Sequence, residues 1–257
     1  MTNLEWCIDY LKKYNRINRD FGLTEKDNFR GLMNITMPYN LSEEFYSKQD
    51  EVIKEILSTK KITDCNDLKM LTDKICLYLG DITLIKADAI VNACNSRLLG
   101  CFQPLHLCVD NAIHSFAGLQ VRRDLMPVME KQGHEEPAGC AKITKAYNLP
   151  SKYIIHTVGP IVYVRVHDDD RQELYSSYIS SLTLADQYNL SSIVFSSIST
   201  GLYGYPINEA SIVALDAVKD YFEKNKNSNI KRVVFNLFKE DDYNVYLKNI
   251  KEYYRQR

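Results

Sequence analysis

Two cysteines and a histidine lie within eight residues in the middle of the chain. Cys101, His106 and Cys108 come just before a short stretch with the apolar spacing of a helix. Thiolates and imidazole are good ligands for zinc, and three protein ligands leave one coordination position open. A metal with an open position can bind water or substrate, whereas a fully coordinated metal only holds the chain together. The spacing therefore predicts a zinc site and favours a catalytic one.

Two other interpretations of these three residues stay open from the spacing alone. Free cysteine is among the most buried residue types, so they are also compatible with unrelated core positions. Pro104 argues against a helix here, and the segment is expected to be a loop that can fold around an ion. A structural zinc with a fourth ligand is the second alternative, for which Cys94 and Cys140 are the candidates.

Polar side chains flank this loop on both sides. Asp110 stands at the start of a helix expected over residues 109–117, where a carboxylate commonly caps the backbone. The same carboxylate is also placed to act as a general base beside a metal, although spacing alone favours the cap. Asn92 and Asn95 follow the apolar residues 89–91 of an expected strand, and they either fix the loop or hydrogen-bond the hydroxyls of a sugar.

A run of small residues, 196–206, lies between an expected strand and an expected helix. Small residues and glycines at such a junction let backbone N–H groups face a phosphate, aided by the helix dipole. The run lacks the lysine of a P-loop, so triphosphate chemistry is not expected. An ordinary strand-to-helix turn is the alternative.

The elements that must position these residues alternate between short apolar runs and amphipathic stretches, which is typical of an α/β layered fold with a mostly parallel sheet. Ligands in such folds bind in the loops beyond the carboxyl ends of the strands, where all of the segments above are expected to lie. Strands are predicted at 75–79, 89–93, 142–146, 153–157, 192–197 and 232–238. Helices are predicted at 109–117, 173–188, 209–223 and 241–254.

Residues 1–70 are more polar than the rest of the chain. Apolar spacing predicts one helix near residues 4–11 and a second near 45–57, with a loop containing Gly31 between them. Residues 168–171, which are mostly acidic, are expected to form a solvated loop. The histidines outside the candidate zinc loop, among them His114 and His156, have no ligand spacing.

Composition bounds the class of protein. The chain has 257 residues, with 32 Lys and Arg against 33 Asp and Glu, so its charge gives no reason to expect nucleic acid or an anionic membrane as a partner. No apolar run approaches the ~20 residues of a membrane span, and the first residues lack the form of a signal peptide. The seven cysteines are an odd number without framework spacing. We therefore expect reduced thiols and a cytoplasmic location.

Taken together, these segments resemble a macrodomain. The resemblance covers roughly residues 70–257, and it implies a helical N-terminal extension at 1–70 and a macrodomain at 71–257. It also implies a three-layer α/β/α fold with a mixed, mostly parallel sheet. The matching segments are residues 80–83, 88–95, 109–114, 117–118, 139–144, 147–150, 156–160 and 197–206.

Within that family the chain is similar to the zinc-dependent branch of microbial ADP-ribosyl hydrolases. Most macrodomains carry a run of glycines before the Val-Asp pair, whereas residues 100–108 here contain the two cysteines and the histidine, as in the zinc branch. The helical extension also resembles that branch. Cys94 departs from the usual alanine, and we expect this change to be harmless.

The resemblance implies ADP-ribose as the ligand and assigns roles to matching residues. Asp81 would accept a hydrogen bond from the adenine, with Ile82 beside it. Asn92 and Asn95 would lie near the distal ribose, and Asp110 near its C1″ side, with Asn95 and Asp110 as the catalytic residues. The diphosphate would lie against Ser199, Thr200, Gly201, Leu202 and Tyr203.

These inferences combine into one expected activity. A zinc-dependent hydrolase would remove ADP-ribose from mono-ADP-ribosylated protein side chains, with Zn²⁺ bound by the three residues of the loop. The resemblance suggests a lipoyl-carrier protein as one partner, and we expect a monomer. A reader that binds ADP-ribose without turnover is one alternative, and a macrodomain hydrolase with a purely structural zinc is the other.

Overall fold

The computed structural model describes residues 1–255 and is built around one mixed sheet. Six strands are arranged in the order β2-β8-β7-β4-β6-β5, and all neighbours are parallel except β5 and β6. Their bounds are β2 Ile75–Leu79, β4 Ala89–Ala93, β5 Ala141–Lys145, β6 Tyr153–Thr157, β7 Ser192–Phe195 and β8 Arg232–Leu237. A second, two-stranded parallel pair joins β1 Thr63–Asp64 to β3 Ile85–Lys86.

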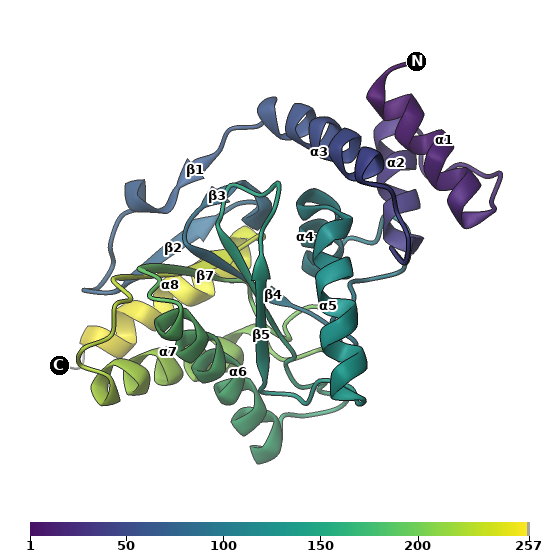
Figure 1. The fold of residues 1–257 in the computed structure, drawn as a ribbon. Helices are drawn as coiled ribbons and strands as arrows, with labels where there is room; N and C mark the ends of the chain where they lie inside the picture. The colour runs from purple at the N-terminus through teal and green to yellow at the C-terminus, as the bar shows by residue number, and fades with distance from the viewer. Residues whose placement is uncertain (256–257) are drawn as a thin grey trace.

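Helices cover both faces of the large sheet and make three layers (Figure 1). Alternate residues of each strand point to opposite faces. In β7, for example, Ile193 and Phe195 join one hydrophobic cluster, while Val194 joins the other. The first cluster packs under α6 Asp168–Gln187, α7 Ile207–Lys224 and α8 Glu240–Arg255, and the second under α4 Val109–Ala117 and α5 Leu119–Gln132. The expected three-layer α/β/α architecture is therefore confirmed.

The N-terminal region contains three helices instead of the two expected. They are α1 Asn3–Asn15, α2 Glu25–Ile35 and α3 Glu43–Ser58, and each begins at a Thr or Ser whose side chain accepts a backbone N–H. The expectation that Gly31 lies in a loop was wrong, because it lies within α2. A Cβ there would be 2.4 Å from the Cβ of Phe21, so glycine allows close packing at this point.

The three helices share a hydrophobic cluster that continues into the rest of the chain through Phe116 and Leu119. In Figure 1 they lie beside α4 and α5, on the side of the molecule away from α8. The N-terminal region thus packs against the helix that follows the candidate zinc loop.

Two further sequence expectations were wrong, whereas the ends of the other predicted strands and of the helices from α4 onward either coincide with the structure or differ by at most five residues. Helix α5 was not predicted, because Gly118 precedes it and Pro127 lies inside it. Residues 168–171 form the first turn of α6 and not a loop, and its first three acids suit the positive end of a helix.

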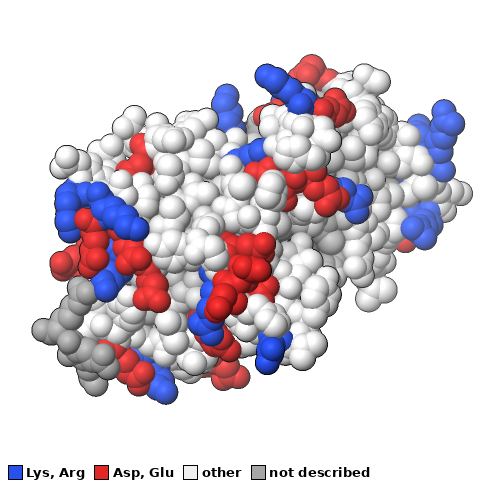
Figure 2. All heavy atoms as spheres, turned by 90° about the horizontal axis from the view of Figure 1, so that it is seen from below, with Lys and Arg blue, Asp and Glu red and all other residues white. Residues whose placement is uncertain are grey.

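The described part of the chain contains no helix that is long and apolar enough to cross a membrane. On the face shown in Figure 2, acidic and basic side chains are interspersed with uncharged surface, and the described residues form no continuous basic area there. This distribution agrees with the balanced composition.

Candidate active site

The candidate residues gather at one edge of the sheet because their strands run in parallel. Asp81 follows β2, Asn95 follows β4, and the run of small residues that begins at Ser196 follows β7. Parallel strands place their carboxyl ends at a common edge, where ligands bind in open α/β sheets. The edge predicted from the sequence is therefore present.

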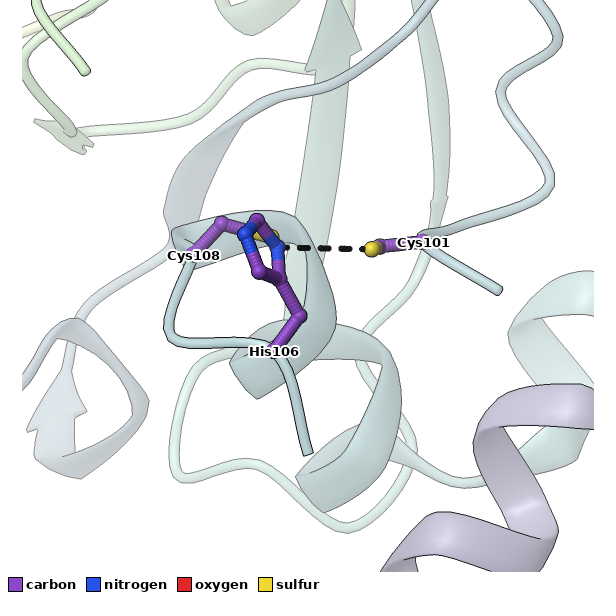
Figure 3. A group of neighbouring side chains, drawn as sticks. All are labelled: Cys101, His106 and Cys108. Atoms are coloured by element: carbon purple, nitrogen blue, oxygen red, sulfur yellow. Dashed lines mark hydrogen bonds between the residues drawn. The ribbon is translucent and has the colours of Figure 1, made fainter. Parts of the chain in front are cut away.

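The loop between β4 and α4 brings together the two cysteines and the histidine (Figure 3). The Sγ atom of Cys101 lies 3.5 Å from Nδ1 of His106. The ligand atoms of Cys101, His106 and Cys108 all lie within 4.8 Å of one another, and all three residues are half-buried. The loop thus presents three convergent donor atoms to partly accessible space.

This geometry fits a zinc ion. Bonds of ~2.3 Å to sulfur and ~2.0 Å to nitrogen in a tetrahedron place the two atoms about 3.5 Å apart. The separation of 3.5 Å between Cys101 Sγ and His106 Nδ1 agrees with that value. Within the described residues, neither proposed fourth ligand belongs to the cluster. Cys94 is buried with its thiol donating to the carbonyl of Thr157, and Cys140 is exposed outside the cluster.

Cys108 has a second role that the sequence did not predict, because it caps α4. Its side chain accepts the backbone N–H of Asn111 at 3.4 Å. The interpretation of Asp110 as the cap was therefore wrong, since this residue lies within the first turn of the helix. Burial raises the pKa of the Cys108 thiol to about 12, and the neighbouring Cys101 sulfur acts in the same direction.

Asp110 is held by two asparagines, Asn92 within β4 and Asn95 just after it. Its Oδ1 atom accepts a hydrogen bond of 2.8 Å from Asn92 Nδ2, and its Oδ2 atom lies 3.5 Å from Asn95 Nδ2. Asn95 also donates to the carbonyl of Gly100 and accepts from the N–H of Arg97, which fixes the start of the candidate zinc loop. The carboxylate is only 4% exposed.

Burial sets the protonation of this group and its neighbours. It raises the pKa of Asp110 to about 6, while the hydrogen bond from Asn92 and the charge of Arg122 oppose the shift. Burial also lowers the pKa of His156 to about 3, and it lowers that of His114 well below the usual range with help from Arg122. At neutral pH both histidines are therefore uncharged, and Asp110 is mostly ionised.

Two histidines that local spacing did not predict also lie in the site. His114 Nε2 lies 3.4 Å from Asp110 Oδ1, and His156 contacts Asn92 at 3.3 Å through Nδ1 and Thr144 at 2.9 Å through Nε2. The spacing of four residues between Asp110 and His114 places both on one face of a helix, which was the available signal. His156 is brought in by pairing of β6 with β4, which local spacing does not reveal.

Asp81 and Ile82 lie at the start of a 3-10 turn, Ile82–Leu84, that follows β2. Oδ1 of Asp81 accepts from both the backbone N–H and the hydroxyl of Thr83, at 2.9 and 2.7 Å. These two hydrogen bonds orient the carboxylate, and both of them use Oδ1 and not Oδ2. Asp81 is half-buried and Ile82 is buried, an arrangement that suits an apolar ring with a polar edge.

The predicted phosphate loop forms a tight turn whose tip is open to solvent. Ser199 has φ 64° and accepts the backbone N–H of Tyr205, while Gly201 accepts that of Gly204. A Cβ at Gly201 would meet no atom within 4 Å, and Leu202 is 80% exposed. Thr200 and Tyr203 are half-buried. The pKa of Tyr203 is raised by burial, and the charge of Asp110 contributes to that shift.

Comparison with known proteins agrees with this fold. A family model described as Macro domain matches residues 91–214, which contain the metal loop, α4 and the phosphate loop. A protein-ADP-ribose hydrolase of Treponema medium is 45% identical over 223 residues, covering 85% of this chain and 85% of that protein. This chain belongs to the macro domain family.

Solved macrodomains support the same conclusion. A variant of the Oceanobacillus iheyensis macrodomain with ADPR is 37% identical, with a TM-score of 0.65 over 73% of this chain and 98% of that one. The Trypanosoma brucei macrodomain in complex with ADP-ribose is 30% identical, with a TM-score of 0.66 over 83% of this chain and 93% of that one.

Proposed function

We propose that this macrodomain removes ADP-ribose from mono-ADP-ribosylated protein side chains and that Zn²⁺ bound by Cys101, His106 and Cys108 takes part. The named activity of the Treponema medium relative and the ADP-ribose ligands of the solved macrodomains support the reaction and its ligand. The observation that carries the zinc requirement is the convergence of three ligand atoms two residues from Asp110.

The residues at the edge of the sheet fit the parts of ADP-ribose in order. Asp81 and Ile82 would hold the adenine, and Ser199–Tyr203 the diphosphate. Asn92 Oδ1 is buried and has no partner among the described residues, so it can accept from a hydroxyl of the distal ribose. Asn95 and Asp110 would then face the bond that is broken.

Asp110 is suited to move a proton in this reaction. A general base works best when its pKa lies near the operating pH, and burial brings this carboxyl to about 6. Hydrogen bonds from Asn92 and Asn95 orient it, so it would position a water molecule and accept its proton. A bound zinc ion would supply positive charge to a ligand oxygen or lower the pKa of bound water.

One assay separates this proposal from a reader without turnover, and the effect of zinc removal on the fold separates it from a structural zinc. A mono-ADP-ribosylated protein, with an ADP-ribosylated lipoyl-carrier protein as one substrate, is incubated with native, chelated and zinc-restored enzyme. We expect turnover only with zinc present. Binding of ADP-ribose without turnover in all three states would indicate a reader. Unchanged turnover after chelation would show that hydrolysis does not need zinc, and Asp110 would remain as the candidate catalytic group.

The ligand assignment has its own test. Cys101→Ala and His106→Ala each remove one of three ligands, so we expect zinc far below the one ion per chain of the native protein. Elemental analysis of the purified variants measures this ratio, with Cys140→Ala as the matched control because that cysteine is exposed and lies outside the cluster. A full zinc complement in either ligand variant would disprove the assignment.

A further inference from the structure

We propose that helix α2 of the N-terminal region is a structural part of the metal site, with Arg30 and Asn34 as positioning residues. The two side chains lie one helical turn apart on α2 and contact the loop that carries His106. The inference rests on the proposed zinc site, and it assigns the N-terminal region a role beyond packing.

Arg30 joins α2 to both the metal loop and the first turns of α4. Its Nη2 atom donates to Asn111 Oδ1 at 2.7 Å and to the backbone carbonyl of His106 at 3.4 Å. Its Nε atom donates to Asn111 Oδ1 at 3.2 Å and to Ser115 Oγ at 3.3 Å. A planar guanidinium presents several N–H groups in a fixed fork, so one side chain fixes three partners at once.

Asn111 transmits this contact to the ligands. Its Nδ2 atom donates to the carbonyl of Gln103 at 3.0 Å, and its backbone N–H donates to Cys108 Sγ. Arg30 thus contacts a residue that itself holds one ligand and the middle of the loop. Loss of a residue that orients metal ligands in this way typically weakens metal affinity by about 10- to 100-fold.

Asn34 holds the loop at a strained position. Leu105, which precedes His106, has φ 59°, a left-handed conformation that a branched side chain rarely adopts. Asn34 Oδ1 accepts the backbone N–H of Leu105 at 3.0 Å, and its Nδ2 donates to Ser115 Oγ at 3.0 Å. Such strain persists only where surrounding contacts impose it, and α2 supplies this contact.

The part of the loop around Cys101 is attached to the same helix through a residue of α5. The buried guanidinium of Arg122 donates to the carbonyl of Leu99 at 2.6 Å and lies 4.3 Å from the ring of Phe102. It also donates to the carbonyls of Met33, Asn34 and Thr36 at the end of α2. Both limbs of the loop, one carrying Cys101 and one carrying His106, are therefore fixed relative to α2.

Without these contacts the loop would have to be ordered when the metal binds. The cost of ordering would be subtracted from the binding free energy, so zinc would bind more weakly even though all three ligands remain. The expected effect on affinity is ~10-fold, at the lower end of what loss of an outer-shell contact usually costs.

The test measures zinc affinity by competition with a metal-binding dye, using full-length protein. We expect Arg30→Ala and Asn34→Ala to bind zinc ~10-fold more weakly than the native chain. Lys26→Ala is the matched control, because Lys26 is an exposed residue of the same helix, and its zinc affinity should be unchanged. Circular dichroism of each metal-free variant checks that it is folded.

Arg30→Lys separates position from charge. Lysine keeps the positive charge near Cys108 but lacks the fork, so we expect its zinc affinity to fall with that of Arg30→Ala. Native affinity in Arg30→Lys with loss in Arg30→Ala would assign the effect to charge and overturn the positioning role. Native affinity in all variants would overturn the inference alone, whereas a native chain that binds no zinc would overturn the proposed site as well.

Discussion

At the scale of single residues, type and spacing predicted that three possible metal ligands converge, but not the groups around them. Cys101, His106 and Cys108 could be recognised as possible metal ligands because three such donors so close together are unusual. Pro104 indicated that they lie in a loop. The sequence did not predict that Arg122 and His114 are buried near Asp110, since burial depends on contacts distant in the sequence. The role of Asp110 changed for the same reason, because the cap is the thiol of Cys108.

Asp110→Asn should stabilise the metal-free protein at high pH while impairing hydrolysis. Its folded-state pKa of about 6 lies above the unfolded value, so the native state binds more protons between them. This contribution to stability is present below pH ~4 and is lost as the pH rises through 6. The variant should therefore gain up to about 3 kcal/mol at pH 8 and little at pH 4, and turnover should fall ~100-fold or more.

Urea unfolding of the two metal-free proteins at both pH values measures this difference. Equal stability changes at pH 4 and pH 8 would contradict a buried, ionised carboxylate. Unchanged turnover would remove Asp110 from the chemistry.

At the scale of elements, periodicity predicted the strands and α4 well. Alternating and continuous apolar runs located all six strands of the large sheet, with ends shifted by at most two residues. Helices interrupted by Gly31 or Pro127 were missed, because these residues usually end helices and only tertiary packing shows that they do not here. The small residues between β7 and α7 were predicted to form a phosphate loop. The tight turn within that loop, from Ser199 to Tyr205, was not predicted.

Gly159→Ala should disturb the phosphate loop from a neighbouring element. A Cβ at Gly159, just after β6, would lie 2.1 Å from Ser199 Oγ and 2.6 Å from Ile198 Cγ2. The loop must shift to relieve this overlap, so we expect ADP-ribose to bind at least ~10-fold more weakly and the protein to lose about 1–3 kcal/mol of stability. Isothermal titration with ADP-ribose and thermal unfolding measure the two effects.

Gly201→Ala provides the matched control for stability, because a Cβ at this position meets no atom within 4 Å. Its melting temperature should equal that of the native protein. Native ADP-ribose affinity in Gly159→Ala would show that the loop between β7 and α7 does not contact the ligand.

At the scale of the whole molecule, the hydrophobic clusters on the two faces of the sheet do not include the proposed zinc ligands. Removing zinc should therefore leave far-ultraviolet circular dichroism nearly unchanged while turnover falls by orders of magnitude. ADP-ribose should still raise the melting temperature, because it binds the native state. Broad unfolding on chelation would instead indicate a structural zinc, and spectra recorded with and without a chelator distinguish the two.

The contacts from α2 to the loop have a consequence for how the site forms. Arg30 and Asn111 are 81 residues apart, and Arg122 reaches carbonyls 86 to 89 residues earlier. Closing such long segments costs chain entropy, which is recovered only when the segments between them have also folded. The eight residues from Cys101 to Cys108 are therefore unlike a short peptide that wraps around its metal. During refolding, tight zinc binding should therefore arise late. Its appearance would indicate that the first 35 residues have packed against α4 and α5.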